Sequence, residues 1–294
     1  MSSPSQTESS ASVLQSTARR TLPDVRFVAV APNGGRRVHS DHPAVPLDPA
    51  SLAQTAKACL DQGAAMIHLH VREPDGSHLL DKDAYDQAIS AVKTACGDDI
   101  LIQITTETLG KYPVEAQRQI VRDVRPEAAS LAFREFVPSQ DDGADADAFA
   151  ALLTWMREAG ALPQIILYDL PDLERLQGFC AAHDFTVESL NLLYVLGRYT
   201  KTPNGLKQVA ELVSHPRLEP KSLMTCAFGP AELQSVTAAA LFGADVRVGF
   251  ENNLWTPDGS VAPDNAALVC AAAGSLSAMG FTLGSADTLR KLWQ

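Results

Sequence analysis

The sequence predicts a (β/α)8 barrel, or TIM barrel, and three observations support this fold class. Short apolar runs rich in β-branched residues alternate with amphipathic helical segments, and eight such strand-then-helix units follow one another from Val25 onward. The strand runs are apolar throughout, as expected for parallel strands that helices cover. A barrel of eight units typically has about 250 residues, which suits a single barrel domain over residues 24–294.

The units can be placed in order along the chain. The expected strands are 25–31, 66–71, 100–105, 129–133, 164–168, 189–196, 222–227 and 245–250. The expected helices are 51–62, 82–95, 113–124, 145–159, 171–183, 206–213, 230–242 and 265–279. Asp81 is a typical helix N-cap, and Gly63 and Gly160 stand where helices should end. A doubly wound sheet is the alternative, but residues 32–37 lack the G-x-G-x-x-G turn that it would need.

Composition narrows the class of function. The formal charge of −11 argues against nucleic acid as a partner, because the chain offers no basic stripe to neutralise phosphates. No apolar run approaches the roughly 18 residues of a membrane span. The five cysteines are scattered, which predicts reduced thiols and a cytoplasmic location. Residues 1–23 are rich in Ser, Thr, Gln and Ala, so we expect a disordered tail or a short arm there.

In a barrel the C-terminal ends of the strands meet on one rim, which is where active sites lie. Polar residues follow nearly every expected strand. In chain order they are Asn33 and Arg36; His68 and His70; Thr105, Thr106 and Glu107; Arg134 and Glu135; Tyr168 and Asp169; Arg198; Cys226; and Arg247, Glu251 and Asn252. Some are expected to be solvated loop residues, but their density favours an active site at this rim.

His68 and His70 end the second expected strand. Side chains alternate across a strand, so both imidazoles should project on the same side of the sheet. With one further ligand such a pair can hold a divalent metal, although each His could instead be a satisfied core residue. Glu251 could reach the pair, because the last strand of a closed barrel lies beside the first and the second strand is next. It could equally cap the loop that follows.

Arg247 is expected to point into the barrel, where a guanidinium needs an anion. It could hold a substrate carboxylate or an oxyanion, or it could form a structural ion pair with Glu135 or Asp169. The hydroxyls of Thr105 and Thr106 could contact a carboxylate or carbonyl oxygen of a substrate.

Asn33 and Arg36 are candidate substrate contacts in the first loop. Arg36 and Arg37 could bind a carboxylate or the phosphates of a cofactor, or they could simply be solvated. Cys226 has no adjacent His to act as a base, so we interpret it as a packing residue.

Several motifs together resemble the β-keto acid cleavage enzymes, the family that includes 3-keto-5-aminohexanoate cleavage enzyme. They are Pro-Asn-Gly-Gly-Arg (32–36), His-Pro-Ala-Val-Pro (42–46), Gly-Ala-Ala-Met-Ile-His-Leu-His-Val-Arg (63–72), Gln-Ile-Thr-Thr (103–106), Arg-Val-Gly-Phe-Glu-Asn (247–252) and Pro-Asp-Asn-Ala-Ala-Leu-Val (263–269). The His-Leu-His-Val-Arg strand, followed far downstream by Arg-x-Gly-Phe-Glu, is specific in combination.

The resemblance implies a zinc-bearing barrel, usually a homo-oligomer, that condenses a β-keto acid with acetyl-CoA to give acetoacetate and a new acyl-CoA. By position, the resemblance implies that His68, His70 and Glu251 bind one Zn²⁺ ion. It also implies that Arg247 stabilises developing negative charge, that Thr105 contacts the substrate carboxylate, and that Asp169 lies near the substrate's distal group. Zinc rests on the resemblance, because two imidazoles and a carboxylate suit several divalent ions.

Two departures from the family pattern bear on the mechanism. The family usually has Glu-Asp where this chain has Glu251 and Asn252, and that Asp is thought to be the general base. An amide cannot accept a proton near neutral pH. The usual Gly-Gly after Thr-Thr is Glu107-Thr108, and residues 133–136 replace a small, polar run. Glu107 or Glu135 could supply the base, and we expect a different distal group on the substrate.

Three functions therefore stand side by side. The leading hypothesis is a zinc-dependent β-keto acid cleavage enzyme that uses acetyl-CoA and forms a dimer or tetramer. The second keeps the metal but not CoA, as a lyase or hydrolase of oxo-acids with an activated water as nucleophile. The third is a metal-binding paralogue that has lost turnover because Asn252 replaces the usual Asp.

Overall fold

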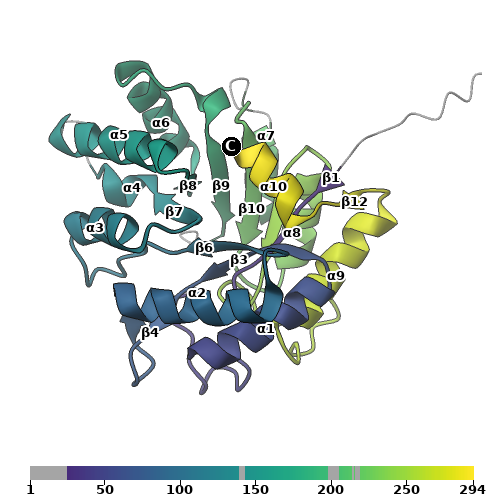
Figure 1. The fold of residues 1–294 in the computed structure, drawn as a ribbon. Helices are drawn as coiled ribbons and strands as arrows, with labels where there is room; N and C mark the ends of the chain where they lie inside the picture. The colour runs from purple at the N-terminus through teal and green to yellow at the C-terminus, as the bar shows by residue number, and fades with distance from the viewer. Residues whose placement is uncertain (1–24, 139–142, 198–204, 214, 216–218) are drawn as a thin grey trace, which may run out of the picture.

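The computed structural model describes residues 25–138, 143–197, 205–213, 215 and 219–294. These residues form a closed barrel of eight parallel strands with helices around it, so the predicted (β/α)8 fold is confirmed (Figure 1). The order of strands around the barrel is β10-β11-β2-β3-β6-β7-β8-β9. The predicted tail over 1–23 and the rim residue Arg198 lie outside the described residues.

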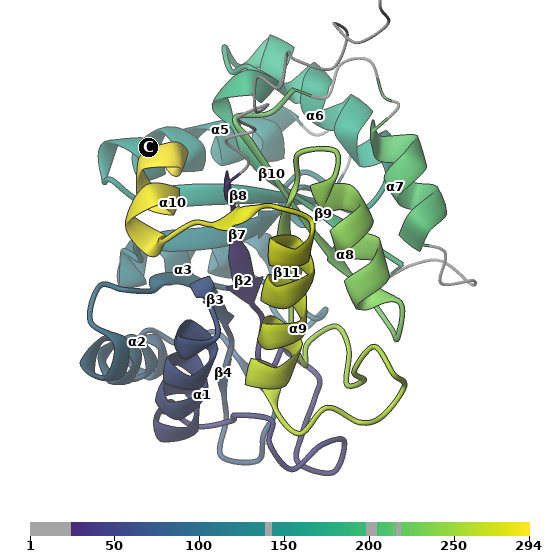
Figure 2. The ribbon, with the colours of Figure 1, turned by 90° about the vertical axis from the view of Figure 1, so that its right-hand side faces the viewer.

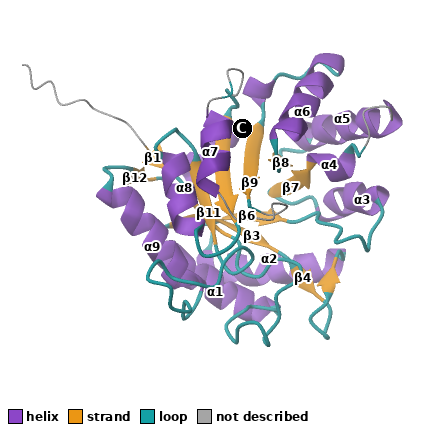
Figure 3. Ribbon diagram, turned by 180° about the vertical axis from the view of Figure 1, so that it is seen from behind, coloured by secondary structure: helices purple, strands orange, loops and turns teal. Residues whose placement is uncertain are grey.

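Strands occupy the centre of the molecule and helices its outside (Figure 3). The barrel strands are β2 (Val28–Val30), β3 (Ala64–Leu69), β6 (Leu101–Ile104), β7 (Ala128–Ala132), β8 (Leu162–Leu167), β9 (Asn191–Leu196), β10 (Ser222–Ala227) and β11 (Asp245–Val248). The helices between and after them are α1 (Pro49–Asp61), α2 (Lys82–Cys96), α3 (Val114–Val124), α5 (Gly143–Glu158), α6 (Leu170–Ala182), α7 (Gly205–Val213), α8 (Glu232–Ala240) and α9 (Asn265–Ala278). Figure 2 shows α8 and α9 side by side on one flank.

Acidic side chains begin several of these helices. Asp48 accepts hydrogen bonds from the backbone N–H groups of Ala50 and Ser51, at 2.9 and 3.0 Å, where α1 begins. Asp81 accepts one from the backbone N–H of Ala84 at the start of α2, which confirms the predicted cap. Each contact satisfies a backbone donor that would otherwise have no partner in the first turn.

Strand β3 shows how the sequence divides the core into two regions. Ile67 and Leu69 pack in the large cluster between the strands and the helices, whereas Met66 belongs to the smaller cluster inside the barrel. Because side chains alternate along a strand, His68 shares the face of Met66 and points into the barrel. The whole of β3 is buried, which explains its unbroken apolar pattern around the one imidazole.

Two of the expected strands are divided. Only the middle of the first one joins the barrel, because β1 (Val25–Arg26) instead pairs in parallel with β12 (Thr282–Leu283), and the two lie together in Figures 1 and 3. The second one ends at Leu69, and β4 (Val71–Arg72) forms an antiparallel hairpin with β5 (His78–Leu79).

Helix α10 (Ala286–Trp293), which the sequence patterns did not identify, covers the N-terminal end of the barrel. Its Leu289 and Trp293 are buried in the cluster inside the barrel. Asn191, at the start of β9, donates a hydrogen bond to the carbonyl oxygen of Trp293 at 3.3 Å. Two shorter elements were also not expected: α4 (Phe133–Phe136) and a 3-10 helix (Val187–Ser189). Every helix in the described part of the chain is too short or too polar to cross a membrane.

Candidate metal centre and active site

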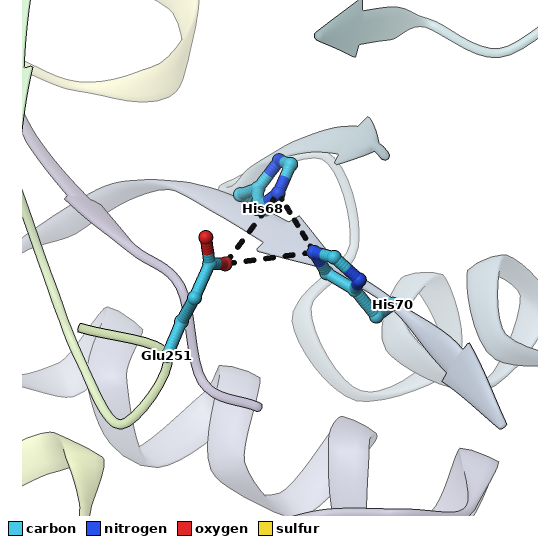
Figure 4. Close-up of side chains that lie close together, drawn as sticks. All are labelled: His68, His70 and Glu251. Carbon is cyan, nitrogen blue, oxygen red and sulfur yellow. Dashed lines mark hydrogen bonds and ion pairs between the residues drawn. The ribbon is translucent and has the colours of Figure 1, made fainter. Parts of the chain in front are cut away.

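His68, His70 and Glu251 meet at the C-terminal rim of the barrel. Figure 4 shows both rings, from one stretch of chain, turned toward the carboxylate, which comes from the segment after β11. The Nε2 atoms of the two imidazoles are 3.2 Å apart. Glu251 Oε2 lies 3.6 Å from Nε2 of His68 and 3.5 Å from Nε2 of His70. The structure therefore brings together the three residues that the sequence analysis nominated as ligands.

The spacing of these three atoms fits a divalent metal such as zinc. Zinc binds imidazole nitrogen and carboxylate oxygen at about 2.0–2.2 Å in a tetrahedral arrangement, so its ligand atoms lie roughly 3.3–3.6 Å from one another. The observed separations of 3.2–3.6 Å agree with that range to within about 0.1 Å. Glu251 Oε2 is also buried without a hydrogen-bond partner, and such an acceptor is costly unless a cation or donor satisfies it. The residues present thus fit the ion that the resemblance implies.

Neighbouring side chains hold the two imidazoles in place. Gln103 on β6 places its Oε1 2.8 Å from Nδ1 of His68, so that nitrogen carries the hydrogen and Nε2 is left as a lone pair. Asn33 donates from Nδ2 to the backbone carbonyl oxygen of His70 at 2.9 Å, and its Oδ1 accepts from the backbone N–H of His70 at 3.3 Å. Burial and the nearby positive charge of Arg247 lower the pKa of His68 to about 3. Its ring is therefore neutral at neutral pH, as a ligand must be.

Arg247 reaches Glu251 rather than the carboxylates that the sequence analysis considered. Its Nη2 lies 3.1 Å from Glu251 Oε1 and 3.3 Å from the Sγ of Cys226. Burial alone would raise the pKa of Glu251, but Arg247 and the two imidazoles outweigh it and hold that pKa well below its usual range. Nε and Nη1 of Arg247 remain buried without partners. Burial raises the pKa of the Cys226 thiol, in keeping with its interpretation as a packing residue.

Two glycines allow the close approaches that place Glu251: Gly34 lies against Glu251 itself, and Gly249 lies against the backbone of Ala31. A Cβ on Gly34 would lie 2.6 Å from Glu251 Cγ, and Gly34 has a φ of +57°. A Cβ on Gly249 would lie 2.4 Å from the carbonyl oxygen of Ala31, at a φ of +139°. Both positions therefore need a residue without a side chain, and both lie in motifs that carry the family resemblance.

The segment that carries Glu251 is fixed on both sides by buried polar side chains. Glu232, at the start of α8, accepts hydrogen bonds from the backbone N–H of Gly249 and from Nδ2 of Asn253, both at 3.2 Å. Asn265, at the start of α9, accepts one from the backbone N–H of Phe250 at 2.8 Å. The backbone N–H of Glu251 itself donates to Ala31 at 3.0 Å. The carboxylate therefore projects from a rigid support.

A cavity of about 20 Å³ lies beside the three ligand residues, which is room for about one water or ion. Thr105, Thr106 and Glu107 contribute to its wall, together with Tyr168 and Arg247. The hydroxyl of Thr106 donates to the carbonyl oxygen of Ser130 at 2.7 Å. The hydroxyl of Thr105 accepts from the backbone N–H of Glu107 at 3.0 Å, which leaves its own hydrogen for a ligand.

A wider cleft of about 430 Å³ adjoins this cavity. Asn33 and Arg36 line it, and Glu107 and Glu251 line both spaces. The cleft therefore leads from the surface to the candidate metal centre.

Three predicted site residues line neither space. Glu135 accepts hydrogen bonds from Nε2 of Gln117 at 2.7 Å and from the backbone N–H of Thr108 at 3.3 Å. Asp169 caps α6 and forms an ion pair with Arg134 at 2.8 Å. Asn252 is buried, and neither its side-chain oxygen nor its nitrogen has a partner. The proposed chemical roles of these three residues stay predictions.

Several residues that shape the site were not found by the sequence analysis. They are Glu232, Asn265 and His78. Glu232 begins a helix, where polar residues are common, so the sequence carried no sign that it would be buried. Gln103 and Asn265 lay inside family motifs but were not assigned roles.

Known proteins resemble this chain along nearly its whole length. Residues 26–294 match the family described as beta-keto acid cleavage enzyme. The 3-keto-5-aminohexanoate cleavage enzyme of Fusobacterium nucleatum is 26% identical, over 91% of this chain and 97% of that protein. The 3-oxoadipate:acetyl-CoA acetyltransferase of Cupriavidus necator is 26% identical over 90% and 93%. The 3,5-dioxohexanoate:acetyl-CoA acetone transferase of Paraburkholderia graminis is 26% identical over 83% and 87%.

Solved structures extend the likeness to the fold. A ternary complex of ObcA with a C4-CoA adduct and oxalate has a TM-score of 0.67, with 16% sequence identity over 85% of this chain and 67% of that one. A type I 3-dehydroquinate dehydratase from Clostridium difficile has a TM-score of 0.55 at 10% identity, over 84% of this chain and 92% of that one. At such identities the likeness supports the barrel fold alone.

Proposed function

Because this chain belongs to the beta-keto acid cleavage enzyme family, we propose that it cleaves a β-keto acid with acetyl-CoA as co-substrate, giving acetoacetate and a new acyl-CoA. The observation that carries the proposal is the buried His68, His70 and Glu251 cluster, with Arg247 beside it and a cleft leading to it. Two of the relatives are named for reactions with acetyl-CoA, which supports this co-substrate.

We propose Zn²⁺ as the ion held by His68, His70 and Glu251, in a protein that works in the cytoplasm as a homo-oligomer. Three protein ligands leave a coordination position open, which is typical of a catalytic rather than a structural zinc. When bound there, the ion would supply Lewis-acid polarisation of a carbonyl oxygen.

Arg247 is suited to stabilise the negative charge that develops on the keto acid. One edge of its guanidinium is held by Glu251 and Cys226, while Nε and Nη1 are buried and unpartnered beside the cavity. Donors fixed in place before the reaction cost no reorganisation when charge appears. Thr105 can donate its hydroxyl hydrogen to the substrate carboxylate from the same wall.

In the proposed reaction, the carbon between the carboxylate and the keto group loses a proton. The resulting enolate forms a bond to the thioester carbonyl carbon of acetyl-CoA and displaces the CoA thiolate. That thiolate then attacks the original keto carbon, and the bond between this carbon and its neighbour breaks. The electron pair of the broken bond stays on the acetoacetate carbon, which takes back the proton that the base removed. Acetoacetate leaves with the acetyl group, and CoA leaves on the remaining acyl chain.

We propose Glu107 as the base that removes the proton. It lines both the cavity and the cleft, whereas Glu135 lines neither and is hydrogen-bonded to Gln117. The amide of Asn252 cannot take the proton, and its buried side chain lines neither the cavity nor the cleft. A general base typically contributes about 10²–10⁴-fold in rate. Glu107→Gln should therefore lower kcat by at least about 100-fold, with Glu135→Gln as the matched control.

Asn33 and Arg36 are proposed substrate contacts at the mouth of the site. Arg36 is exposed in the cleft, so it can meet an anionic group on the distal part of a substrate or a phosphate of CoA. Asn33 is committed through its side chain to His70 and Pro46, so its contribution is to hold the loop. Asp169 forms an ion pair with Arg134 at the rim. Because its carboxylate is occupied in this way, we propose that the substrate's distal group differs from one that a free carboxylate would bind.

Labelled acetyl-CoA tests the reaction directly. Zinc-loaded protein would be incubated with a panel of β-keto acids and acetyl-CoA carrying ¹³C in the acetyl group, and the products analysed by mass spectrometry. The proposed bond changes put the label in acetoacetate and leave the new acyl-CoA unlabelled.

Each other outcome identifies a different function. Products that form without acetyl-CoA would replace the proposal with a CoA-independent lyase or hydrolase of oxo-acids. Absence of turnover across the panel, with Asn252→Asp restoring it, would identify a metal-binding paralogue.

A further inference from the structure

His78 lies behind the metal ligand His70, on the hairpin strand β5. Its ring is buried, with its centroid 5.4 Å from that of His70. Its Nε2 is 2.6 Å from the backbone carbonyl oxygen of Glu107. A carbonyl oxygen can only accept a hydrogen bond, so Nε2 of His78 carries the hydrogen. A second hydrogen, on Nδ1 of His78, would be buried without an acceptor. The ring is therefore neutral, and its Nδ1 carries a lone pair.

His70, by contrast, has a ring hydrogen that needs an acceptor. Its Nε2 faces His68 and Glu251, so this atom is the one that binds a metal. A neutral imidazole has one hydrogen, which must then be on Nδ1. That atom is buried without an acceptor, just as Nδ1 of His78 is buried without a donor. The two orphaned atoms are a donor and an acceptor on adjacent rings.

We propose that His78 is the positioning residue for the metal ligand His70: Nδ1 of His78 accepts the hydrogen of His70 Nδ1, directly after a small ring rotation or through one bridging water. His68 already has such a partner, because Gln103 Oε1 lies 2.8 Å from its Nδ1. A metal-binding histidine nearly always donates its second ring nitrogen to an acceptor, which fixes the ring and makes it a better ligand. His78 fills that place for the second histidine.

This assignment links the metal centre to the base that we propose. One edge of the His78 ring would hold His70, while the other holds the backbone of Glu107. The hairpin that carries His78 is itself fixed, since Nζ of Lys111 donates to the carbonyl oxygen of His78 at 3.0 Å. The inference rests on the metal centre of the proposed function but not on the acyl transfer.

Two substitutions test the two hydrogen bonds of the His78 ring separately. In His78→Asn the side-chain amide falls near the position of Nδ1, so an acceptor for His70 is kept and the contact to Glu107 is lost. In His78→Gln the amide falls near Nε2, so the contact to Glu107 is kept and the acceptor is lost. The Zn²⁺ affinity of each metal-free protein would be measured by competition with a chromophoric chelator. Removal of such a partner typically weakens metal binding about 10–100-fold.

We expect His78→Gln to bind Zn²⁺ about 10–100-fold more weakly than the wild type, and the Zn²⁺ affinity of His78→Asn to stay within a few-fold of the wild type. Equal affinities for all three proteins, or an equal loss in both variants, would overturn the assignment. If the wild type itself binds no Zn²⁺, both the metal centre and this inference fail. A wild type that binds Zn²⁺ but transfers no acyl group would refute the proposed reaction alone.

A second measurement needs no variant. In the zinc-loaded wild type labelled with ¹⁵N-histidine, the NMR spectrum should show hydrogen on Nε2 of His78 and on Nδ1 of His70. Hydrogen on Nδ1 of His78 would overturn the assignment even if both variants failed to fold.

Discussion

Replacement of Gly34 by Ala should disable metal binding without unfolding the protein. The new Cβ would lie 2.6 Å from Glu251 Cγ, 3.1 Å from its Cβ and 3.3 Å from its Cα, whereas ordinary contacts begin at 3.4 Å. The carboxylate therefore has to move by about 0.8 Å, and ligand distances in a metal site hold to within about 0.2 Å. Glu251 cannot retreat as a unit, because its backbone is hydrogen-bonded to Ala31 and its neighbours to Glu232 and Asn265.

The size of the effect follows from this geometry. We expect a loss of Zn²⁺ affinity of about 100-fold, or about 2.7 kcal/mol, because one of three ligands is displaced. Ala at a φ of +57° also strains the backbone, at a cost of about 1–2 kcal/mol. Affinity would be measured by chelator competition, and stability by urea unfolding of the metal-free protein.

Gly110→Ala is the matched control. Gly110 has a φ of +73°, and a Cβ there would meet nothing within 4 Å. The control carries the same backbone strain without the contact, so it should lose similar stability and keep its Zn²⁺ affinity. If Gly34→Ala binds Zn²⁺ as tightly as Gly110→Ala does, Glu251 is not held where a ligand must be, and the reasoning is wrong.

Three further predictions follow from the same contacts. Arg247→Lys should lower kcat by about 100-fold or more, because Lys cannot replace the fixed guanidinium donors. The Zn²⁺ affinity of this variant should fall less than about tenfold. An unchanged kcat would show that Arg247 has no part in the mechanism. Glu232→Ala should lower the free energy of urea unfolding by about 1–3 kcal/mol and weaken Zn²⁺ binding, because Gly249 and Asn253 lose their shared acceptor. Glu232→Gln should recover part of the lost stability and part of the lost affinity. Full Zn²⁺ affinity in the Ala variant would show that Glu251 needs no such support. The metal-free protein should lose stability as the pH falls from about 6.5 toward 3, by about 1.4 kcal/mol per pH unit for each of His68 and His78, because the unfolded chain binds protons that the buried rings, with pKa values of about 3, do not. Urea titrations at several pH values would test this, and an unchanged slope in His78→Gln would contradict it.

The parts of the site that could be predicted are those that the barrel itself places. The i, i+2 spacing of His68 and His70 fixes a shared face, and neighbouring parallel strands bring Glu251 and Arg247 to the same rim. The sequence left open whether Arg247 would pair with Glu135 or Asp169, and the structure pairs it with Glu251 instead. Which carboxylate pairs with Arg247 depends on how far each side chain extends into the barrel, and residue spacing in the sequence does not determine this.

The parts that could not be predicted depend on contacts between distant segments. Glu135 and Asp169 stand at strand ends, as rim residues should, but Gln117 and Arg134 engage them away from the cavity. Glu232 is a helix-start residue whose burial comes from packing against the β11 segment. The two-residue strands β1 and β12 are too short to produce any periodicity, and only their pairing makes them visible.

The pairing of β1 with β12 has a consequence for how the protein is made. Val25 is paired in register with Thr282, and α10 then covers the barrel floor beneath Met66 and Leu101. On the ribosome, the earliest described strand has no partner until nearly all of the described chain has emerged. The apolar residues of the barrel floor therefore stay uncovered until the last helix has been made, and a nascent chain with such residues exposed is prone to aggregation.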